Sequence, residues 1–430
     1  MVAPVRQHAE GWKQQLKLLV VTQYFHPENF RVNELVAEMV RRGHDVTVLT
    51  GLPNYPQGRF FPGYGWLGPW RELIAGAQVF RVPLFLRARG NGWRLALNYL
   101  SFAFCASLAA LIRIPRAQDA IFVFEPSPIT VGLPAIAASW RCNAPIVFWV
   151  LDLWPESLEA TGAVRSPWIL GRVERLVKWI YSRCHLVLGQ SKSFLDNIAR
   201  LGVPPARLRY FPNWIETGYE AAVLAAERVG RNEFRIVYAG NIGAAQDFSA
   251  VIEAAVKLAQ TAPQVRWIVA GDGRMASWVK REVAARGLQE KFELLGQLPP
   301  QDMPALFASA DALLVALRAD PVFALTIPGK VQSYLASGKP VLAMLDGEGA
   351  RVVEESGAGL AAPAGDADRL AELALRLTAM SAQELEQMGS QARDYAAREF
   401  GREVLFERLE NWLQEAAENH QSKRKHEHAR

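Results

Sequence analysis

Two segments of the sequence combine a strand end with glycines and a following helix, an arrangement that presents backbone N–H groups to an anion. In RIVYAGNIGAAQDF (235–248), a β-rich run meets Gly240, Asn241 and Gly243 before a helical pattern begins. GDGR (271–274) follows the apolar run VRWIVA in the same way. The first segment has neither the GxGxxG spacing of a dinucleotide-binding turn nor the Lys-Ser or Lys-Thr pair of a P-loop. It therefore predicts a phosphate site of another kind.

A third segment, TIPGKVQSYLASGKP (326–340), adds a positive charge. Pro328 and Gly329 precede Lys330, and a helical pattern starts at about this lysine. Helix-start N–H groups with one lysine can hold a diphosphate without a metal ion. We expect Lys330 to converge with the 240–243 turn on one ligand, although Lys330 taken alone is equally consistent with a surface lysine.

Polar residues also end strands in the N-terminal half. Asp152, in VLDLWPES, ends a very apolar strand, where burial would raise its pKa and favour a functional role. The alternative is helix capping, with Pro155 as the first helical residue. Glu125, in FEPSP, ends the preceding strand and is a similar candidate. His26, in QYFHPENF, follows the first strand and is either a ligand for phosphate or acceptor or a structural turn residue.

The sequence shows no credible set of metal ligands. The acidic pair in DAD (366–368) opens a helix and is typical of an N-cap. Cys105, Cys142 and Cys184 are scattered, lack the spacing of a zinc site and fit a reducing compartment. We therefore expect neither a metal nor a cofactor.

Strands alternate with helices along the N-terminal half, as in a parallel doubly wound sheet. Expected strands are LKLLVVTQ (16–23), HDVTVLTG (44–51), QVFRVPL (78–84), AIFVFEP (120–126), APIVFWV (144–150) and HLVLGQS (185–191), with helices over 31–43, 93–114, 132–142 and 168–183 and a long loop over 51–69.

The alternation restarts after a break at FPNWIE (211–216). Short apolar runs cover 234–240, 265–273, 291–297, 311–317, 339–345 and 357–363, with closing helices over 366–379, 382–398 and 402–418. A chain of 430 residues is too long for one core. The expected fold is thus α/β, with two Rossmann-like doubly wound domains facing a cleft, and ligands at the carboxyl ends of strands.

The charge and the chain ends limit the possible partners. The formal net charge of +5 is only mildly basic and does not indicate nucleic acid. The first 17 residues lack the apolar segment of a secretory signal peptide, so we expect a cytoplasmic protein. The polar, basic end NHQSKRKHEHAR (419–430) predicts a disordered tail.

One stretch, WRLALNYLSFAFCASLAALIRIP (93–115), is long enough to concern a membrane. It is interpreted as a mostly buried helix, as a helix lying partly in a membrane surface, or as a true span. Arg81, Arg87, Arg89 and Arg94 alternate with Phe85 and Trp93 nearby. Cations among aromatic residues suit anionic lipid head groups and equally suit a solvated loop.

Taken together, these motifs resemble bacterial family-4 (group 1) glycosyltransferases of GT-B fold, over about residues 16–415. The similarity is greatest to the branch that builds surface polysaccharides and includes N-acetylfucosaminyl and colanic-acid fucosyl transferases. Its marks, in order, are YFHPE, RGHDVTVLTGLPNYPQG, LDLWPES, FPNW, AGNIGAAQDF, AGDG and IPGKVQSYLASGKPVLA. Together they are specific, whereas any one alone is weak.

The resemblance implies an acceptor-binding N-terminal domain (16–212) after an extension (1–15), and a C-terminal domain (213–400) that binds a nucleotide-sugar. A helix over 401–418 would cross back to the first domain. The resemblance further implies transfer with retained anomeric configuration and without metal. We interpret the donor as UDP-linked and the acceptor as a polyprenyl-diphosphate-linked saccharide at the inner face of the cytoplasmic membrane.

The resemblance also assigns site residues. Catalysis would involve Lys330 and Asp152. The donor diphosphate would contact Gly240, Asn241, Gly243, Gln246 and Lys330, the nucleotide and sugar would contact Gly271, Asp272, Gly273, Gly296, Gln297, Leu298, Thr326, Pro328, Gly329 and Ser333, and the acceptor side would include His26, Glu28, Glu125 and Asp152.

Several family features are missing. Two glutamates with seven residues between them are replaced by Leu325 and Ser333, and Gln246 lies near where the usual basic pair would be. Ser333 could still bind the ribose, whereas Leu325 offers no hydrogen bond to the sugar, which favours a deoxy or N-acetyl sugar. Two rival functions stay open: a nucleotide-sugar epimerase of the same fold, and an inactive membrane-associated scaffold, which the missing glutamates favour.

Overall fold

A computed structural model describes residues 14–87, 92–160, 162–215 and 232–428, which form two compact units. Unit 1 comprises the described parts of 1–189, 197–209 and 406–430. Unit 2 comprises 190–196 and the described parts of 210–405. The chain therefore enters unit 2 for residues 190–196, returns to unit 1, and enters unit 2 again at Tyr210.

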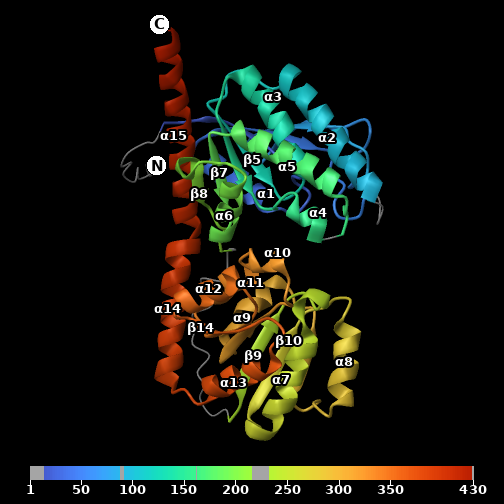
Figure 1. Cartoon of the computed structure of the whole chain (residues 1–430), viewed down its shortest axis with the longest axis vertical. Coiled ribbons are helices and arrows are strands. Elements are labelled where there is room, and N and C mark those ends of the chain that lie inside the picture. Colours follow the sequence, from blue (N-terminus) through green and yellow to red (C-terminus); the bar gives the residue numbers. More distant parts are fainter. Residues whose placement is uncertain (1–13, 88–91, 161, 216–231, 429–430) are drawn as a thin grey trace, which may run out of the picture. The chain divides into compact units, whose positions relative to one another are not determined.

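Unit 1 is an eight-stranded sheet with helices between its strands (Figure 1). Its elements are β1 (Lys17–Val21), α1 (Arg31–Arg41), β2 (Asp45–Gly51), β3 (Arg71–Ile74), β4 (Ala77–Val82), α2 (Gly92–Ile112), β5 (Ala120–Glu125), α3 (Gly132–Cys142), β6 (Ile146–Val150), α4 (Glu156–Ala160), α5 (Pro167–Ser182), β7 (Leu186–Gly189), α6 (Lys192–Arg200) and β8 (Leu208–Tyr210).

The strands of unit 1 lie in the order β3-β4-β2-β1-β5-β6-β7-β8. At the centre, Val20 of β1 lies opposite Val48 of β2 and Phe122 of β5 in parallel register. Such strands are continuous apolar runs because helices cover both of their faces. The edge strand β3 runs antiparallel to β4 and was not predicted, since its four residues are too short and too exposed to show an apolar pattern.

Unit 2 is a six-stranded sheet of order β11-β10-β9-β12-β13-β14 in which all pairs are parallel. Its elements are β9 (Phe234–Ala239), α7 (Phe248–Thr261), β10 (Val265–Ala270), α8 (Ala276–Ala285), β11 (Phe292–Gly296), α9 (Met303–Ala308), β12 (Ala312–Ala316), α10 (Pro321–Ala324), α11 (Gly329–Ala336), β13 (Val341–Met344), α12 (Glu348–Glu355), β14 (Gly359–Ala362), α13 (Ala367–Thr378) and α14 (Ala382–Phe400). The last helix, α15 (Arg402–His428), begins in unit 2 and belongs to unit 1 from Phe406 onwards.

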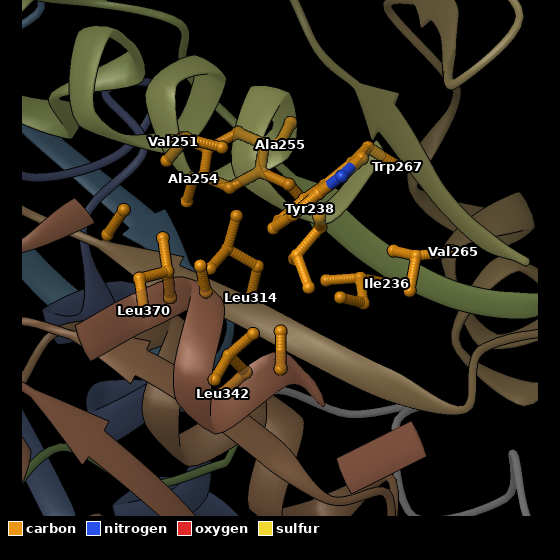
Figure 2. Packing of buried hydrophobic residues seen from close by; sticks show 14 of the residues in the cluster. Ile236, Tyr238, Val251, Ala254, Ala255, Val265, Trp267, Leu314, Leu342 and Leu370 are labelled. Atoms are coloured by element: carbon orange, nitrogen blue, oxygen red, sulfur yellow. The ribbon is translucent and has the colours of Figure 1, made fainter. Parts of the chain in front are cut away.

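Aromatic side chains of unit 2 fill the layer between the sheet and α7. Figure 2 shows Tyr238 and Trp267 together with Val251, Ala254 and Ala255 of α7. Small residues on the helix allow it to approach the large rings on the strands, as close packing requires. This packing fixes the end of β9, from which the 240–243 turn departs.

The structure overturns two expectations about helices. The interpretation of 93–114 as a mostly buried helix is wrong, because only one third of the most apolar window of α2 is buried. Among the described residues, α2 is the one helix long and apolar enough to cross a membrane, which is weak support for a span.

The expected disordered tail is wrong up to His428, because α15 continues to that residue; residues 429–430 lie outside the described part. Glu, Gln, Lys and Arg are good helix formers, and extending an existing helix requires no new nucleus. Unit 1 also holds this helix, since Glu410 accepts hydrogen bonds from Arg42 and lies 3.2 Å from Nε2 of His44.

We predict that Leu413→Ala, on α15, lowers the free energy of unfolding by about 2–5 kcal/mol, the usual cost of such a core deletion. Leu413 is fully buried, so the loss creates a cavity. Urea unfolding followed by tryptophan fluorescence measures the change. The exposed Glu418 on the same helix supplies the control, Glu418→Ala. Equal effects of the two substitutions would show that α15 does not pack as described.

Candidate functional site

In the turn after β9, Gly240 has a backbone conformation that favours glycine, and the flexible end of the Lys330 side chain lies in the space that a Cβ would occupy. Gly240 has φ +132°, and a Cβ there would lie 2.6 Å from Cε and 2.8 Å from Nζ of Lys330. Lys330 is in the first turn of α11, whose N-terminal end favours anions. The structure thus brings together the lysine and the turn that the sequence singled out separately.

Tyr238, the residue two before Gly240, holds the ammonium of Lys330. Nζ of Lys330 donates a hydrogen bond to Oη of Tyr238 and lies 3.7 Å from the centroid of its ring. Oη in turn donates to the carbonyl of Asn241 at 2.5 Å, and the ring packs edge-on against Phe248. Sequence analysis missed Tyr238 because an aromatic residue in a buried strand is typical of the core.

Burial lowers the pKa of Lys330 to about 7. No carboxylate contributes to this shift, so desolvation alone lowers the pKa, and the lysine is only partly protonated near pH 7. An anion beside Nζ would stabilise the charged form and raise the pKa again. A phosphate bound beside Nζ would therefore increase the fraction of Lys330 that is charged at neutral pH.

A second tyrosine fixes α11 against β9. Oη of Tyr334 accepts a hydrogen bond from the amide of Ala239 at 3.0 Å and donates to its carbonyl at 3.3 Å. Tyr334 lies four residues after Lys330, so both side chains leave the same face of α11. The register of Lys330 against the turn is therefore set by a buried side chain of its own helix.

Gln246 caps the turn. Its Oε1 accepts hydrogen bonds from the amide of Gly243 at 2.9 Å and from Nδ2 of Asn241 at 3.2 Å. The Gly243 amide is consequently occupied, contrary to the expectation that it offers a bare N–H group. A bound phosphate would have to exchange with Gln246 for this donor.

The turns after β9, β10 and β11 are joined by backbone hydrogen bonds. The amide of Gly240 donates to Ala270 at 2.8 Å, and the amide of Gly271 donates to Gly296 at 2.7 Å. Gly271, at φ +147°, approaches so closely that a Cβ would lie 1.8 Å from the carbonyl oxygen of Gly240. No other residue fits there.

A cavity of about 280 Å³ opens beside these turns, lined by Ile242, Val269, Gly271, Asp272, Ala276, Ser277, Val279, Lys280, Leu294 and Gly296. Three of the predicted nucleotide-binding residues, Gly271, Asp272 and Gly296, belong to it. Ser277 and Lys280 were not predicted, although their place in the first turns of a helix after GDGR was a usable signal. The apolar walls suit a flat ring such as a nucleobase.

The other predicted donor residues lie outside this cavity. Gly273 donates to Asp272, Oγ1 of Thr326 donates to Phe323, and Ser333 donates to Gly329 at 3.4 Å within its own helix. Gln297 is exposed, whereas Leu298 packs against the core. Pro328 and Gly329 begin α11. These contacts leave the ribose-binding role of Ser333 a prediction.

In unit 1, Asp152 lies in the turn after β6. Its Oδ2 accepts from Nε1 of Trp154 at 3.0 Å, and its Oδ1 accepts from Oγ of Ser157 in the first turn of α4. Burial raises its pKa, while these donors lower it. Asp152 is thus tied to α4 through the hydroxyl of Ser157 rather than through a backbone N–H group, and its functional role stays a prediction.

Glu125 ends β5 and is fully buried. The amides of Leu151 and Asp152 face its carboxyl group, yet neither carboxyl oxygen accepts a hydrogen bond of normal geometry among the described residues. Burial first, and then the charge of Asp152, raise its pKa well above the usual value. Both effects favour the neutral form of the Glu125 carboxyl group.

Glu28 is committed to the backbone. Its carboxylate accepts from the amides of Phe25, Asn54 and Tyr55 at 3.2, 2.8 and 2.7 Å, and burial raises its pKa to about 7. The side chain of His26 is exposed, and its amide donates to Asn33. Glu28 thus anchors the 52–55 loop, and His26 is the residue of this turn open to a ligand.

Within the described residues, no three His, Cys, Asp or Glu side chains lie close enough to hold a metal ion. The predicted cap at 366–368 is confirmed, since Asp366 accepts from the amide of Arg369 at 2.8 Å. Metal-independent chemistry itself stays a prediction.

Both units match known families. Residues 29–214 match the family described as "Glycosyl transferase 4-like domain", and residues 233–380 match "Glycosyl transferases group 1". WcaI of Escherichia coli K12, described as a glycosyl transferase of colanic acid biosynthesis, is 26% identical over 341 residues, 75% of this chain and 82% of WcaI. WbjE of Pseudomonas aeruginosa, described as a glycosyltransferase, is 25% identical over 69% of this chain and 74% of WbjE.

A solved structure shares the fold. HepE of Anabaena, crystallised with UDP, superposes with a TM-score of 0.64 at 16% identity, over 93% of this chain and all of that one. With two parallel-sheet units, both family matches and these relatives, the chain belongs to the GT-B group 1 glycosyltransferases and is an enzyme of that class.

Proposed function

We propose that this glycosyltransferase moves a sugar from a UDP-sugar to a lipid-linked saccharide during surface polysaccharide synthesis (O-antigen, capsule or exopolysaccharide), with retained anomeric configuration and without metal. The observation that carries the donor half is the contact of Lys330 with the glycine turn after β9. Structures of HepE with UDP and with UDP-glucose support the choice of nucleotide.

The proposed role of Lys330 is electrostatic. When the glycosidic bond breaks, negative charge grows on the leaving β-phosphate. A desolvated ammonium next to that oxygen stabilises the transition state more than the ground state, because charge is greater there. In this role the lysine, rather than a divalent ion, neutralises the diphosphate, and the phosphate itself would help to deprotonate the acceptor hydroxyl.

The proposed role of Asp152 is to orient the acceptor or to stabilise the developing oxocarbenium ion. The donors from Trp154 and Ser157 favour its ionised form, whereas burial favours the neutral form of Glu125. The polysaccharide context rests on the description of WcaI. Leu325 in place of a hydrogen-bonding side chain supports a deoxy or N-acetyl sugar.

We predict that UDP stabilises the protein by about 2.7 kcal/mol when supplied at about 100 times its Kd. Thermal unfolding with UDP, GDP, dTDP and NAD, in wild type and in Lys330→Ala, measures this. We expect a rise with UDP alone that is much smaller in the variant, since the variant loses the cation at the diphosphate. Lys339→Ala, a lysine nearby that donates to Ala308, is the control.

Other results would redirect the assignment. A rise with NAD alone would overturn the transferase, and turnover of a UDP-sugar without any acceptor would favour the epimerase. No rise with any nucleotide would favour the inactive scaffold.

We predict that UDP binding takes up a proton above pH 7. Free Lys330 has a pKa of about 7, and the bound diphosphate raises it, so between the two pKa values the complex holds more protons than the free protein. Affinity should fall with rising pH, by up to about tenfold per unit. Calorimetry in buffers of different ionisation enthalpy measures the uptake.

The matched variant for this measurement is Lys330→Met. The terminal phosphate of UDP itself titrates near pH 6, and the variant carries that contribution alone. The same pH dependence in both proteins would show that Lys330 is not the group that titrates.

We predict that Tyr238→Phe acts through Lys330. Without Oη the ammonium loses an acceptor, so its pKa falls further and the pH range of tight UDP binding moves downwards. Misplacement of Nζ should also lower donor turnover by about tenfold or more with a smaller change in KM. Tyr395→Phe, a half-buried tyrosine elsewhere in unit 2, controls for loss of a hydroxyl. An unshifted pH profile in Tyr238→Phe would rule out this positioning role.

A further inference from the structure

Polar side chains of helix α2 face the protein and many of its large apolar side chains face outwards, the reverse of what is expected for a helix in water. Asn98 is buried, where Nδ2 donates to Phe85 at 2.5 Å and Oδ1 accepts from Gln23 at 2.7 Å. Oγ of Ser101 accepts from the amide of Phe85 at 2.9 Å. The hydrogen-bonding residues therefore tie α2 to the protein, and its outer face is left to apolar residues.

The sizes of the side chains on α2 are also reversed, with many small ones inside and large ones outside. The buried face of α2 includes small residues, Ala103, Ala106, Ala109 and Ala110, and the helix packs on α3. Phe102 is buried with them, but six other large residues are exposed, as Phe104 is at 72%. We call this exposed set the α2 face: Trp93, Leu100, Phe104, Leu108, Leu111 and Ile112. Continuous apolar surface of this kind marks an interaction site.

A second exposed stripe lies on α5. The connections from β4 to β5, from β5 to β6 and from β6 to β7 all run the same way along the sheet, so right-handed crossovers place α2, α3 and α5 on one side of it. α3 contacts both neighbours, and Figure 1 shows the three helices on this side of unit 1. The two stripes thus belong to one layer.

The α5 stripe alternates tryptophan with arginine. Trp168, Arg172, Arg175, Trp179 and Arg183 recur at helical spacing and are exposed. The guanidinium of Arg172 lies 4.5 Å from the ring of Trp168, and that of Arg183 lies 5.6 Å from the ring of Trp179. Tryptophan and arginine side by side are typical of the boundary between lipid tails and head groups.

The charge around the α2 face is of one sign. Residues 93–116 contain Arg94, Arg113 and Arg116 and no Asp or Glu. Of the arginines first considered for lipid, Arg81 is excluded, because it is buried and paired with Glu72; Arg89 lies outside the described residues. Arg94 lies at one end of the apolar stripe, and Arg113 and Arg116 lie at the other, where lipid head groups would meet it.

We propose that the α2 face and the α5 stripe together form a docking surface for a bilayer that carries anionic lipid head groups. The apolar side chains enter the boundary of the acyl chains while the arginines meet lipid phosphates, and a neutral or polar protein surface would leave both unmatched. This inference deepens the acceptor half of the proposed function, and it is independent of the donor site.

The test is co-flotation of the full chain with vesicles of phosphatidylglycerol and phosphatidylcholine, compared with vesicles of phosphatidylcholine alone. We expect wild type to float with the anionic vesicles, and Phe104→Gln/Leu108→Gln to lose at least about tenfold in partitioning. Leu73→Gln/Leu375→Gln, two exposed leucines on β3 and α13, should leave partitioning unchanged. Arg172→Gln/Arg175→Gln should remove the preference for anionic vesicles.

Several outcomes would overturn the proposal: no flotation of wild type, equal flotation of wild type and Phe104→Gln/Leu108→Gln, or equal binding to neutral vesicles. Sedimentation velocity without lipid detects the rival occupant, since a wild-type dimer that this variant dissociates would assign the face to a second copy. UDP-dependent stabilisation of each variant separates the two proposals: it should persist in all of them, and its absence from wild type would remove the donor assignment alone.

Discussion

The proposed donor site depends on one close approach, that of the Lys330 side chain to the backbone of Gly240. A Cβ at position 240 would overlap the end of that side chain, so Lys330 reaches this position because residue 240 is a glycine. The same approach removes water from Nζ and brings its pKa to about 7. Tyr334 fixes the helix, Tyr238 fixes the ammonium, and the core around Trp267 fixes Tyr238. A lysine on a freer backbone would be solvated and fully charged before the phosphate arrived, with less to gain from binding it.

The sequence predicted this site in outline and could not predict its details. Buried parallel strands are continuous apolar runs, so most strands and both doubly wound sheets could be identified before the structure. Gly240 and Lys330 could be chosen because a strand, glycines and a helix start are local patterns. Tyr238 could not, because its role appears only when a residue 92 positions away reaches it. Gln246 was placed at the diphosphate, but whether its side chain caps the turn or meets the ligand is a matter of conformation rather than residue type.

Glu28, Glu125 and Asp152, the three candidate carboxylates of unit 1, show why burial alone does not identify a functional acid. All three have a raised pKa, yet their surroundings differ. Glu28 accepts three backbone N–H groups and therefore holds a loop. Among the described residues, the Glu125 carboxyl group accepts no hydrogen bond of normal geometry, so nothing offsets the burial that favours its neutral form. Asp152 accepts from two side-chain donors that favour its anion, and a substrate could replace either donor. Of the three, Asp152 alone combines support for its charged form with exchangeable partners.

The reversed polarity of α2 fits the proposed contact of unit 1 with a membrane. A phenylalanine that stays exposed to water contributes no hydrophobic free energy, whereas the same side chain inserted into the lipid boundary contributes its transfer free energy. Asn98 and Ser101 face inward and hold the helix to the strand ends of unit 1, where Glu125 and Asp152 also lie. A lipid-linked acceptor would bring its saccharide to such a surface only if the protein met the membrane through the same unit. The apolar residues that make α2 costly in solution are therefore those expected of a transferase whose acceptor does not leave the bilayer.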